Sequence, residues 1–398
     1  MNNLTINSIY RQGNIVRQLG QTGKMALIVI ASSLILAPAA QAFEAKISGQ
    51  VSRMVVAPDD AVGDELQYQD IGWSGSRFRF TGSDEMDNGY KWGYRFEIQA
   101  RNNNAGTDGS QLGNNGDNQD NRYQDIYFSG GFGKISFGKG DGAANGSTEV
   151  DMSGTSLASA GPLQDNWGGY KITPDTDATS TVGADGVLKD NDNSIPWKAV
   201  YTMDDALSRQ NRVRYDTPNA SGFSLAVSLN QGNASEVAVR YKGDFGSSKF
   251  GAAVFTATGP DADTSPAFGG VTPGTSTDGD DITGGSASLL LKSGLNFTVA
   301  LSDRDFNSKG KDGASIGGSR DATFFKVGYK TGKHAIAFDV GDSEGNVAGT
   351  EGESTGLTYA FFPHPGVEVF AMVRELDSSG VAGAESVDLV AIGGRVKF

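Results

Sequence analysis

The sequence predicts an all-β fold, a transmembrane antiparallel β-barrel of 16 strands. Apolar and polar residues alternate through most of the chain: Val390, Ile392 and Val396 share one face of the last strand, and Arg395 and Lys397 share the other. No apolar stretch reaches the roughly 18–20 residues that a transmembrane helix needs. Short turns alternate with long polar loops, which is typical of membrane barrels. We therefore expect the apolar faces to meet lipid and the polar faces to line water.

The N-terminal segment, residues 1–42, is predicted to be a cleaved signal peptide. Three basic residues and no acidic ones precede the apolar run Met25–Leu36, and Ala40-Gln41-Ala42 provides a small-x-small cleavage site. A buried or membrane-anchoring helix is the alternative. Residues 43–398 are then expected to form the barrel.

The predicted strands follow one another with similar lengths. In the segment 91–101, Trp92, Tyr94 and Phe96 form one face, and Arg95 and Glu97 lie on the other. One such strand would also fit a soluble sandwich, but the whole series favours a barrel. The predicted strands begin near residues 44, 71, 90, 121, 133, 209, 222, 234, 248, 284, 295, 321, 333, 354, 366 and 387. An even number places both chain ends on the short-turn, periplasmic side, and sixteen strands leave room for an aqueous lumen.

The third long loop, about residues 140–208, is far longer than the others. Loops of this length are usually functional or disordered. We expect it to fold inward and narrow the channel, with a flexible external loop as the alternative. Its final part, residues 197–205, has room for a short strand or helix.

Composition excludes several classes of function. The net charge is −14, and it becomes −17 after removal of the predicted signal peptide, so binding of nucleic acid is not expected. The absence of cysteine excludes disulfides and thiolate chemistry. His334 and His364 are the only histidines, and no nucleophile motif accompanies them. We expect no enzyme activity, no cofactor and no metal centre.

Four segments resemble the general porins of the Gram-negative outer membrane. They are Ser76–Gly82, Arg122–Gly133, Arg214–Pro218 with Gly222-Phe223, and Gly394–Phe398 at the C-terminus. The resemblance implies a homotrimer of 16-stranded barrels in the outer membrane, through which small hydrophilic solutes diffuse. It also implies a constriction where acids of the inward-folded third loop face arginines on the wall, and it makes Phe398 an assembly signal.

Several constriction residues follow from this resemblance. Arg77 and Arg122 match the wall arginines of strands two and four, and Arg79 lies on the same face as Arg77. The position where the family has a basic residue on the sixth strand falls on Asp216 here, which departs from the family pattern. Arg212 and Arg214 lie on the same face of the strand and can supply the positive charge instead. The candidate loop acids are Glu149 and Asp151, with Asp165 and Asp175 as weaker candidates.

The expected function is a water-filled outer-membrane channel for passive diffusion of ions and small hydrophilic solutes, with a mild cation preference from the acidic loops. A substrate-specific channel and a secreted β-rich adhesin are the alternatives. The expected partners are the lipid bilayer and lipopolysaccharide, with divalent cations held by acidic loop residues. Those residues are Asp261, Asp263, Asp278, Asp280 and Asp281, although they lack a complete calcium-loop pattern. A solvated acidic loop tip that holds no cation is the alternative.

Overall fold

The computed structural model describes residues 44–101, 118–174, 176, 180–182, 188–190, 194–260, 279–306, 318–345 and 349–398. The predicted signal peptide, Asp175, and Asp261, Asp263 and Asp278 lie outside these residues. Strands dominate the described chain, and its helices are the single turn α3 (Gln164–Trp167) and the 3₁₀ helix η2 (Trp197–Ala199). Among the described residues, no helix is long and apolar enough to cross a membrane.

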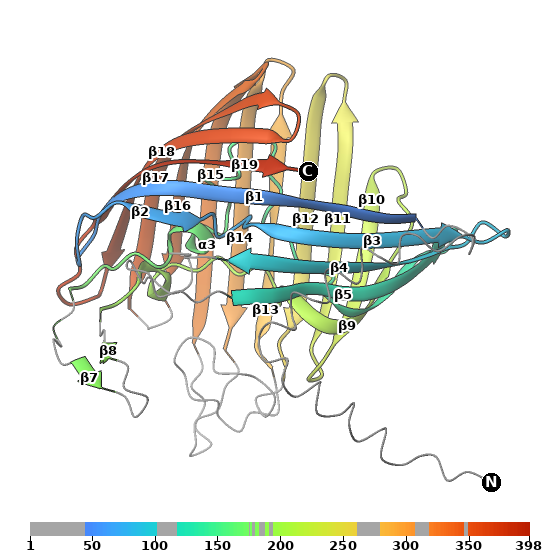
Figure 1. The fold of residues 1–398 in the computed structure, drawn as a ribbon, viewed down its shortest axis with the longest axis horizontal. Coiled ribbons are helices and arrows are strands. Elements are labelled where there is room, and N and C mark those ends of the chain that lie inside the picture. The colour runs from blue at the N-terminus through green and yellow to red at the C-terminus, as the bar shows by residue number, and fades with distance from the viewer. Residues whose placement is uncertain are drawn as a thin grey trace, which may run out of the picture. The chain divides into compact units, whose positions relative to one another are not determined.

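Seventeen strands form one antiparallel sheet that closes on itself where β1 pairs with β19 (Figure 1). A separate two-stranded ribbon consists of β7 (Ser180–Val182) and β8 (Leu188–Asp190). The barrel strands are β1 Glu44–Asp59, β2 Gln67–Asp70, β3 Arg77–Glu85, β4 Lys91–Arg101, β5 Asn118–Gly130, β6 Gly133–Asp141, β9 Arg209–Asp216, β10 Phe223–Asn230, β11 Ser235–Phe245, β12 Ser248–Thr258, β13 Asp281–Leu290, β14 Leu295–Asp305, β15 Ser319–Thr331, β16 His334–Glu344, β17 Glu351–His364, β18 Val367–Ser379 and β19 Val387–Lys397.

β2 and β3 both pair with β1 and together occupy one strand position in the sheet. The seventeen strands therefore fill sixteen positions around the barrel. The prediction of a closed 16-stranded antiparallel barrel is confirmed. The prediction of one continuous strand beginning near residue 71 is wrong, since residues 71–76 interrupt it. Side chains hold this interruption in place: the Gln50 amide donates to the carbonyl oxygens of Ser74 and Gly75 at 2.8 and 3.0 Å.

The C-terminal residue completes the closure of the barrel. Phe398 and Gly49 exchange two backbone hydrogen bonds of 2.9 and 3.1 Å, which extend the β1–β19 ladder to the end of the chain. The Phe398 ring meets Phe78 of β3 edge to face, with 6.3 Å between ring centroids. Both rings are exposed on the outer face. The last residue therefore joins both ends of the sheet.

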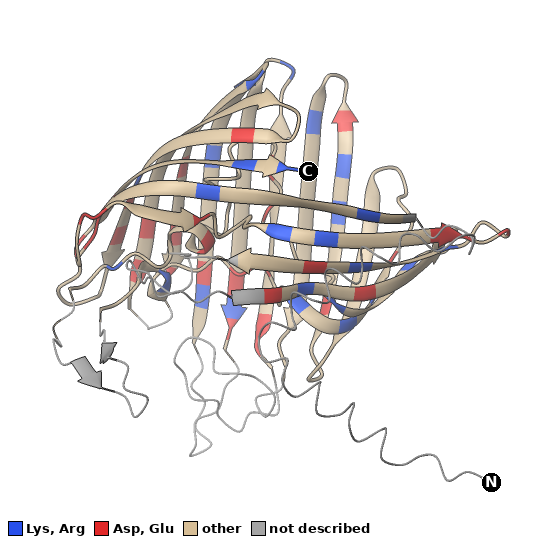
Figure 2. Ribbon diagram, viewed as in Figure 1, with Lys and Arg blue, Asp and Glu red and all other residues tan. Residues whose placement is uncertain are grey.

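Exposed apolar side chains cover the middle of the strands on the outer face. Asp and Glu lie towards the long-loop ends of several strands (Figure 2). On β14, Phe297, Val299 and Leu301 are exposed, followed by Asp303 and Asp305. Several outer acids stand opposite one another on neighbouring strands. These pairs are Asp303–Asp321, Asp342–Glu353 and Glu375–Asp388. An apolar band that ends in charge is typical of the boundary between hydrocarbon and headgroups.

The inner face is not polar throughout. Phe324, Phe370, Met372, Leu376 and Leu389 lie on the buried face of β15, β18 and β19 and are at most 3% exposed. They pack in one core with buried side chains of the connection between β6 and β9, which include Leu157, Trp167, Trp197 and Tyr201. The expectation that the inward face of every strand meets water is wrong in this sector, because the β6–β9 connection covers apolar wall.

Candidate functional site: the charged wall and the connection that faces it

Four arginines of the N-terminal strands converge on one carboxylate. Glu97 of β4 lies opposite Arg79 of β3 in the strand register, and its side chain is fully buried. Arg77 reaches it at 3.5 Å, Arg79 at 2.6 Å, Arg95 at 3.1 Å and Arg122 at 2.9 Å. One carboxylate therefore holds four guanidinium groups, and this wall keeps an excess of positive charge.

A β-bulge aims Arg122 at this cluster. The β4–β5 register passes from Glu97↔Tyr123 directly to Ile98↔Asn121, so Arg122 is an extra residue in β5. Adjacent residues of a regular strand point to opposite faces, whereas a bulge re-aims a side chain. Arg122 can thus donate to Glu97 and to the Gln99 amide oxygen at 2.5 Å, while Tyr123 is buried on the same side.

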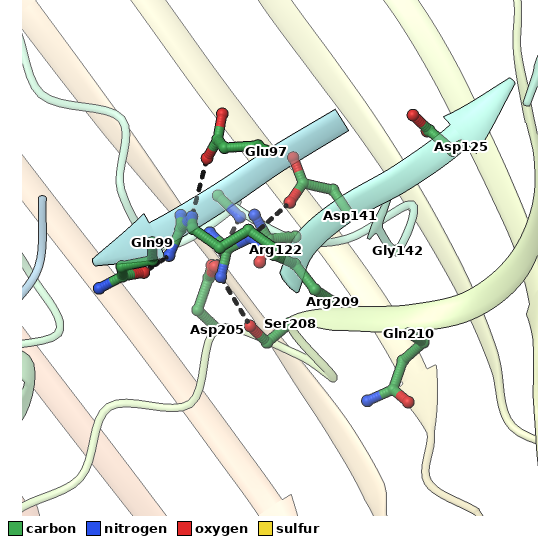
Figure 3. A network of polar contacts seen from close by, with 12 residues as sticks. Glu97, Gln99, Arg122, Asp125, Asp141, Gly142, Asp205, Ser208, Arg209 and Gln210 are labelled. Carbon is green, nitrogen blue, oxygen red and sulfur yellow. Dashed lines mark hydrogen bonds and ion pairs between the residues drawn. The ribbon is translucent and has the colours of Figure 1, made fainter. Parts of the chain in front are cut away.

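A fifth arginine joins from the start of β9. Arg209 forms an ion pair of 3.3 Å with Asp141 at the end of β6, which it faces in the β6–β9 register. Figure 3 shows Arg122 and Arg209 close together, with Glu97, Asp141 and Asp205 around them. The charged wall therefore consists of Arg77, Arg79, Arg95, Arg122 and Arg209, with Glu97 and Asp141 as their acidic partners.

Arg212 and Arg214 of β9 lie apart from the Glu97 cluster. Arg212 is buried and pairs with Asp125 of β5 at 2.7 Å. Arg214 pairs with Asp216 on its own strand at 2.6 Å and donates to the Gly142 carbonyl at 2.7 Å. The sequence-predicted Arg212, Arg214 and Asp216 thus support the start of the β6–β9 connection.

The connection between β6 and β9, residues 142–208, is bonded to the buried faces of many strands. Ala143 donates to Ser228 of β10 at 2.9 Å, and Arg240 of β11 donates to the Ala143 carbonyl at 2.8 Å. Farther along, the backbone nitrogens of Val150 and Met152 donate to Ser286 and Ser288 of β13. These small hydroxyl side chains satisfy backbone donors that no regular strand pairs.

Two buried ion pairs hold the middle of the connection. Asp151 pairs with Lys326 of β15 at 2.7 Å, and Lys326 also donates to the Ser159 carbonyl. The Ser159 hydroxyl donates to Asp339 of β16 at 2.7 Å, and Asp339 pairs with Arg374 of β18 at 2.7 Å. Asp151, predicted to face the arginines, instead compensates a lysine of β15.

Of the acids in the connection, Glu149 and Asp205 lie towards the charged wall. Asp205 accepts hydrogen bonds from the backbone nitrogens of Gly146 at 2.5 Å and Thr148 at 2.9 Å. Glu149 keeps part of its surface exposed but lies deep among protein atoms; burial, then the nearby carboxylates of Asp205 and Asp165, raise its pKa well above the usual value. Burial also raises the pKa of Asp205, which these hydrogen bonds and Arg240 oppose.

The raised pKa of Glu149 predicts a pH-dependent channel. Because the carboxyl group is protonated at a higher pH than an ordinary glutamate, lowering the pH removes negative charge opposite Arg209 before an ordinary glutamate would lose its charge, and the preference for anions increases. Reversal potentials in a salt gradient between pH 8 and pH 5 measure this. Glu149→Gln is expected to flatten the change, and an unaltered pH profile in this variant would contradict the assignment.

Sequence reasoning missed Arg95, Arg209, Glu97 and Asp141 of this wall, and it also missed Tyr123 beside them. The alternation of residues 91–101 places Arg95 on the polar face of its strand. Lys91 and Gln99 lie on that face as well, so the alternation does not single out Arg95. Arg209 owes its position to the long connection that precedes it, and Tyr123 owes its position to the bulge at Arg122. Neither feature leaves a local sequence signal.

Comparisons with known proteins agree with this architecture. A family model described as Gram-negative porin matches residues 26–381. No protein in the curated set matches the chain. Among solved structures, an anion-selective porin from Comamonas acidovorans is similar at a TM-score of 0.57 and 15% identity, with 90% of this chain and 100% of that chain covered.

Two further solved structures have the same fold. The trimer form of OmpT from Vibrio cholerae has a TM-score of 0.53 and 14% identity, over 90% of this chain and 100% of that one. OmpF of Salmonella typhi, in complex with daunomycin, has a TM-score of 0.54 and 13% identity, over 89% of this chain and 98% of that one. At such identities the likeness concerns the fold.

Proposed function

Because this chain belongs to the Gram-negative porin family and is an outer-membrane diffusion channel, we propose that solutes cross it between the charged wall and the β6–β9 connection. The observation that carries the proposal is the contrast between the two sides of the barrel. The connection seals the apolar inner face of β15, β18 and β19, whereas Arg79 and Arg95 keep 36% and 32% of their side-chain surfaces exposed. This contrast supports the proposal that the connection is the inward-folded third loop and narrows the passage from one side.

The passage carries a transverse electric field. Arginines of β3, β4, β5 and β9 lie on one side, and Glu149 and Asp205 of the connection lie on the other. Fixed opposite charges across a narrow, low-dielectric passage orient dipolar solutes and disfavour apolar ones. Passive diffusion of ions and small hydrophilic solutes follows from this arrangement.

The distribution of charge argues for a weak anion preference in place of the mild cation preference expected from the acidic loops. Many acids of the described chain lie on the outer face near the long loops, where the passage does not meet them. Five arginines border the passage against the carboxylates of Glu97, Asp141, Glu149 and Asp205. Protonation of Glu149 as the pH falls would reduce that negative charge further.

The chain is expected to associate with further copies of itself and with lipopolysaccharide. A homotrimer is supported by the family and by the trimer form of the OmpT structure. Lipopolysaccharide with bridging divalent cations is supported by the facing outer acids, such as Asp342 and Glu353, since like charges opposite each other destabilise a sheet unless they are compensated. No described group of three or more acidic or histidine side chains could hold a metal ion by itself, so lipid phosphates would complete the coordination. Asp280 of the predicted acidic loop pairs with Arg304 at 2.7 Å.

The family and fold point to a channel rather than an enzyme.

The proposed channel is tested by inserting the purified, detergent-solubilised protein into planar bilayers. We expect stable conductance steps in groups of three, no saturation with small sugars, and a weak anion preference in a potassium chloride gradient. Saturable block by one solute class would favour a substrate-specific channel, and absence of steps would overturn the proposal.

A further inference from the structure

Tyr123 occupies an unusual position on the charged wall. It lies directly after the bulged Arg122 and opposite Glu97, the carboxylate on which four arginines converge. Its side chain is buried, with 5% of the residue exposed. A buried tyrosine thus lies inside a cluster of cations.

Two guanidinium groups lie over the Tyr123 ring. The Arg95 Cζ atom is 3.3 Å from the ring centroid, which is stacking distance, and the Arg209 Cζ atom is 5.7 Å away. A cation within about 6 Å of an aromatic face is attracted by the ring quadrupole, and the attraction grows as water is excluded. The ring therefore restrains arginines that come from β4 and β9.

Arg95 has few other restraints. One of its terminal nitrogens donates to Glu97 at 3.1 Å, but Glu97 is shared with three more arginines, and the Arg95 Nε atom is buried without a hydrogen-bond partner. Arg209 is bound to Asp141 at 3.3 Å and to Ser208 only at 3.5 Å. Without the ring, both long side chains would regain rotamer freedom in the passage.

These two arginines are also more accessible to a solute than the pair indicated by the sequence. The exposed fraction of the side chain is 32% for Arg95 and 24% for Arg209, against 11% for Arg77 and for Arg122. Arg77 and Arg122 lie behind, where they brace Glu97. The solute-facing charge of Arg95 and Arg209 is thus held by the aromatic contact, whereas Arg79, whose side chain is 36% exposed, is held by its ion pair with Glu97.

We infer that Arg95 and Arg209 are selectivity-determining residues of the channel and that Tyr123 is the positioning residue that fixes both of them against the wall. The solutes concerned are small oxyanions, such as carboxylates and phosphates, whose oxygens match the planar fork of a guanidinium group. This inference rests on the proposed passage along the charged wall. It adds that the aromatic ring, rather than the tyrosine hydroxyl, sets the anion preference.

The experiment compares three variants in planar bilayers: Tyr123→Leu, Tyr123→Phe and Tyr127→Leu. Tyr127 is the matched control, since it is on the same strand and its ring accepts a lone lysine, Lys134, at 4.8 Å. The readouts are the chloride-to-potassium permeability ratio and the scatter of single-channel conductance. A contact of the cation–π kind controls conformer populations by about two- to fivefold, so Tyr123→Leu should change the ratio by that factor and broaden the conductance distribution. Tyr123→Phe and Tyr127→Leu should behave like the unaltered protein.

Coupling to arginine separates positioning from a purely structural role. Arg95→Gln should lower the anion preference in the unaltered protein but have little additional effect in Tyr123→Leu, since interacting residues are non-additive. The inference is overturned if Tyr123→Leu keeps the unaltered permeability ratio, if Tyr123→Phe matches Tyr123→Leu, or if the effects of Arg95→Gln and Tyr123→Leu simply add. Absence of conductance in the unaltered protein would instead remove the proposed function itself.

Discussion

Replacing Trp197 with alanine is expected to destabilise the β6–β9 connection by about 3–5 kcal/mol, the usual cost of truncating a large buried aromatic residue. Trp197 is fully buried, stacks on Tyr201 with 4.4 Å between ring centroids, and donates its indole N–H to the Asp377 carbonyl of β18 at 3.1 Å. The substitution opens a cavity in the core beneath the barrel wall and removes a bond between connection and wall.

The loss should be local, because the ladder hydrogen bonds of the barrel do not depend on Trp197. We expect protease cleavage within residues 142–208 and noisier conductance, while the heat-modifiable gel mobility of the folded barrel persists. Trp92→Ala is the matched control, since Trp92 lies on β4 and is 40% exposed. Equal protease resistance of Trp197→Ala and the unaltered protein would show that the connection is not held by this core.

Replacing Lys326 with methionine is expected to cost about 3–5 kcal/mol, because it leaves the carboxylate of Asp151 buried without its partner. Lys326 is fully buried and Asp151 is 4% exposed. The double variant Lys326→Met/Asp151→Leu should recover much of the loss, since replacing both members of a buried pair by apolar groups is often close to neutral. Urea unfolding in detergent micelles provides the free energies for the double-mutant cycle.

Lys330→Met is the control for this cycle. Lys330 is on the same strand, but it is partly exposed, and its ammonium nitrogen lies 5.4 Å from the centroid of the Phe362 ring. Its replacement should cost less than about 1 kcal/mol. If Lys330→Met proves as harmful as Lys326→Met, or if the double variant is no better than the single one, the ion pair does not anchor the connection.

Strand positions could be predicted closely because the outer face must be apolar wherever it meets lipid. Strands β14 and β16 begin at Leu295 and His334, at or within one residue of the predicted starts. The interruption at residues 71–76 was not predictable in the same way, since its stability comes from the distant Gln50 and Arg395. Alternation specifies two faces of a strand, but not which long-range contacts replace a missing ladder.

The packing of the inner face and the arrangement of the site residues depend even more on contacts between residues that are distant in the sequence. Alternation distinguishes Leu389 and Ala391 from their outward neighbours, but it does not show that the β6–β9 connection covers them. Arg77, Arg79 and Arg122 do converge with the unpredicted Arg95 on Glu97, whereas Asp151 pairs with Lys326. Which acid of a long loop faces which wall depends on how the loop packs, and a single sequence carries no direct record of that packing.

Cysteine accessibility tests most directly whether water follows the charged wall and avoids the opposite side. The natural chain has no cysteine, so single substitutions report without background. The two variants are Arg79→Cys and Met372→Cys. The Arg79 side chain is 36% exposed on the charged wall, whereas Met372 is buried beneath the connection. A bulky, charged, membrane-impermeant thiol reagent is applied to each variant during single-channel recording. We expect a stepwise fall of conductance for Arg79→Cys and no response for Met372→Cys. Rapid modification at position 372 with none at position 79 would contradict the account.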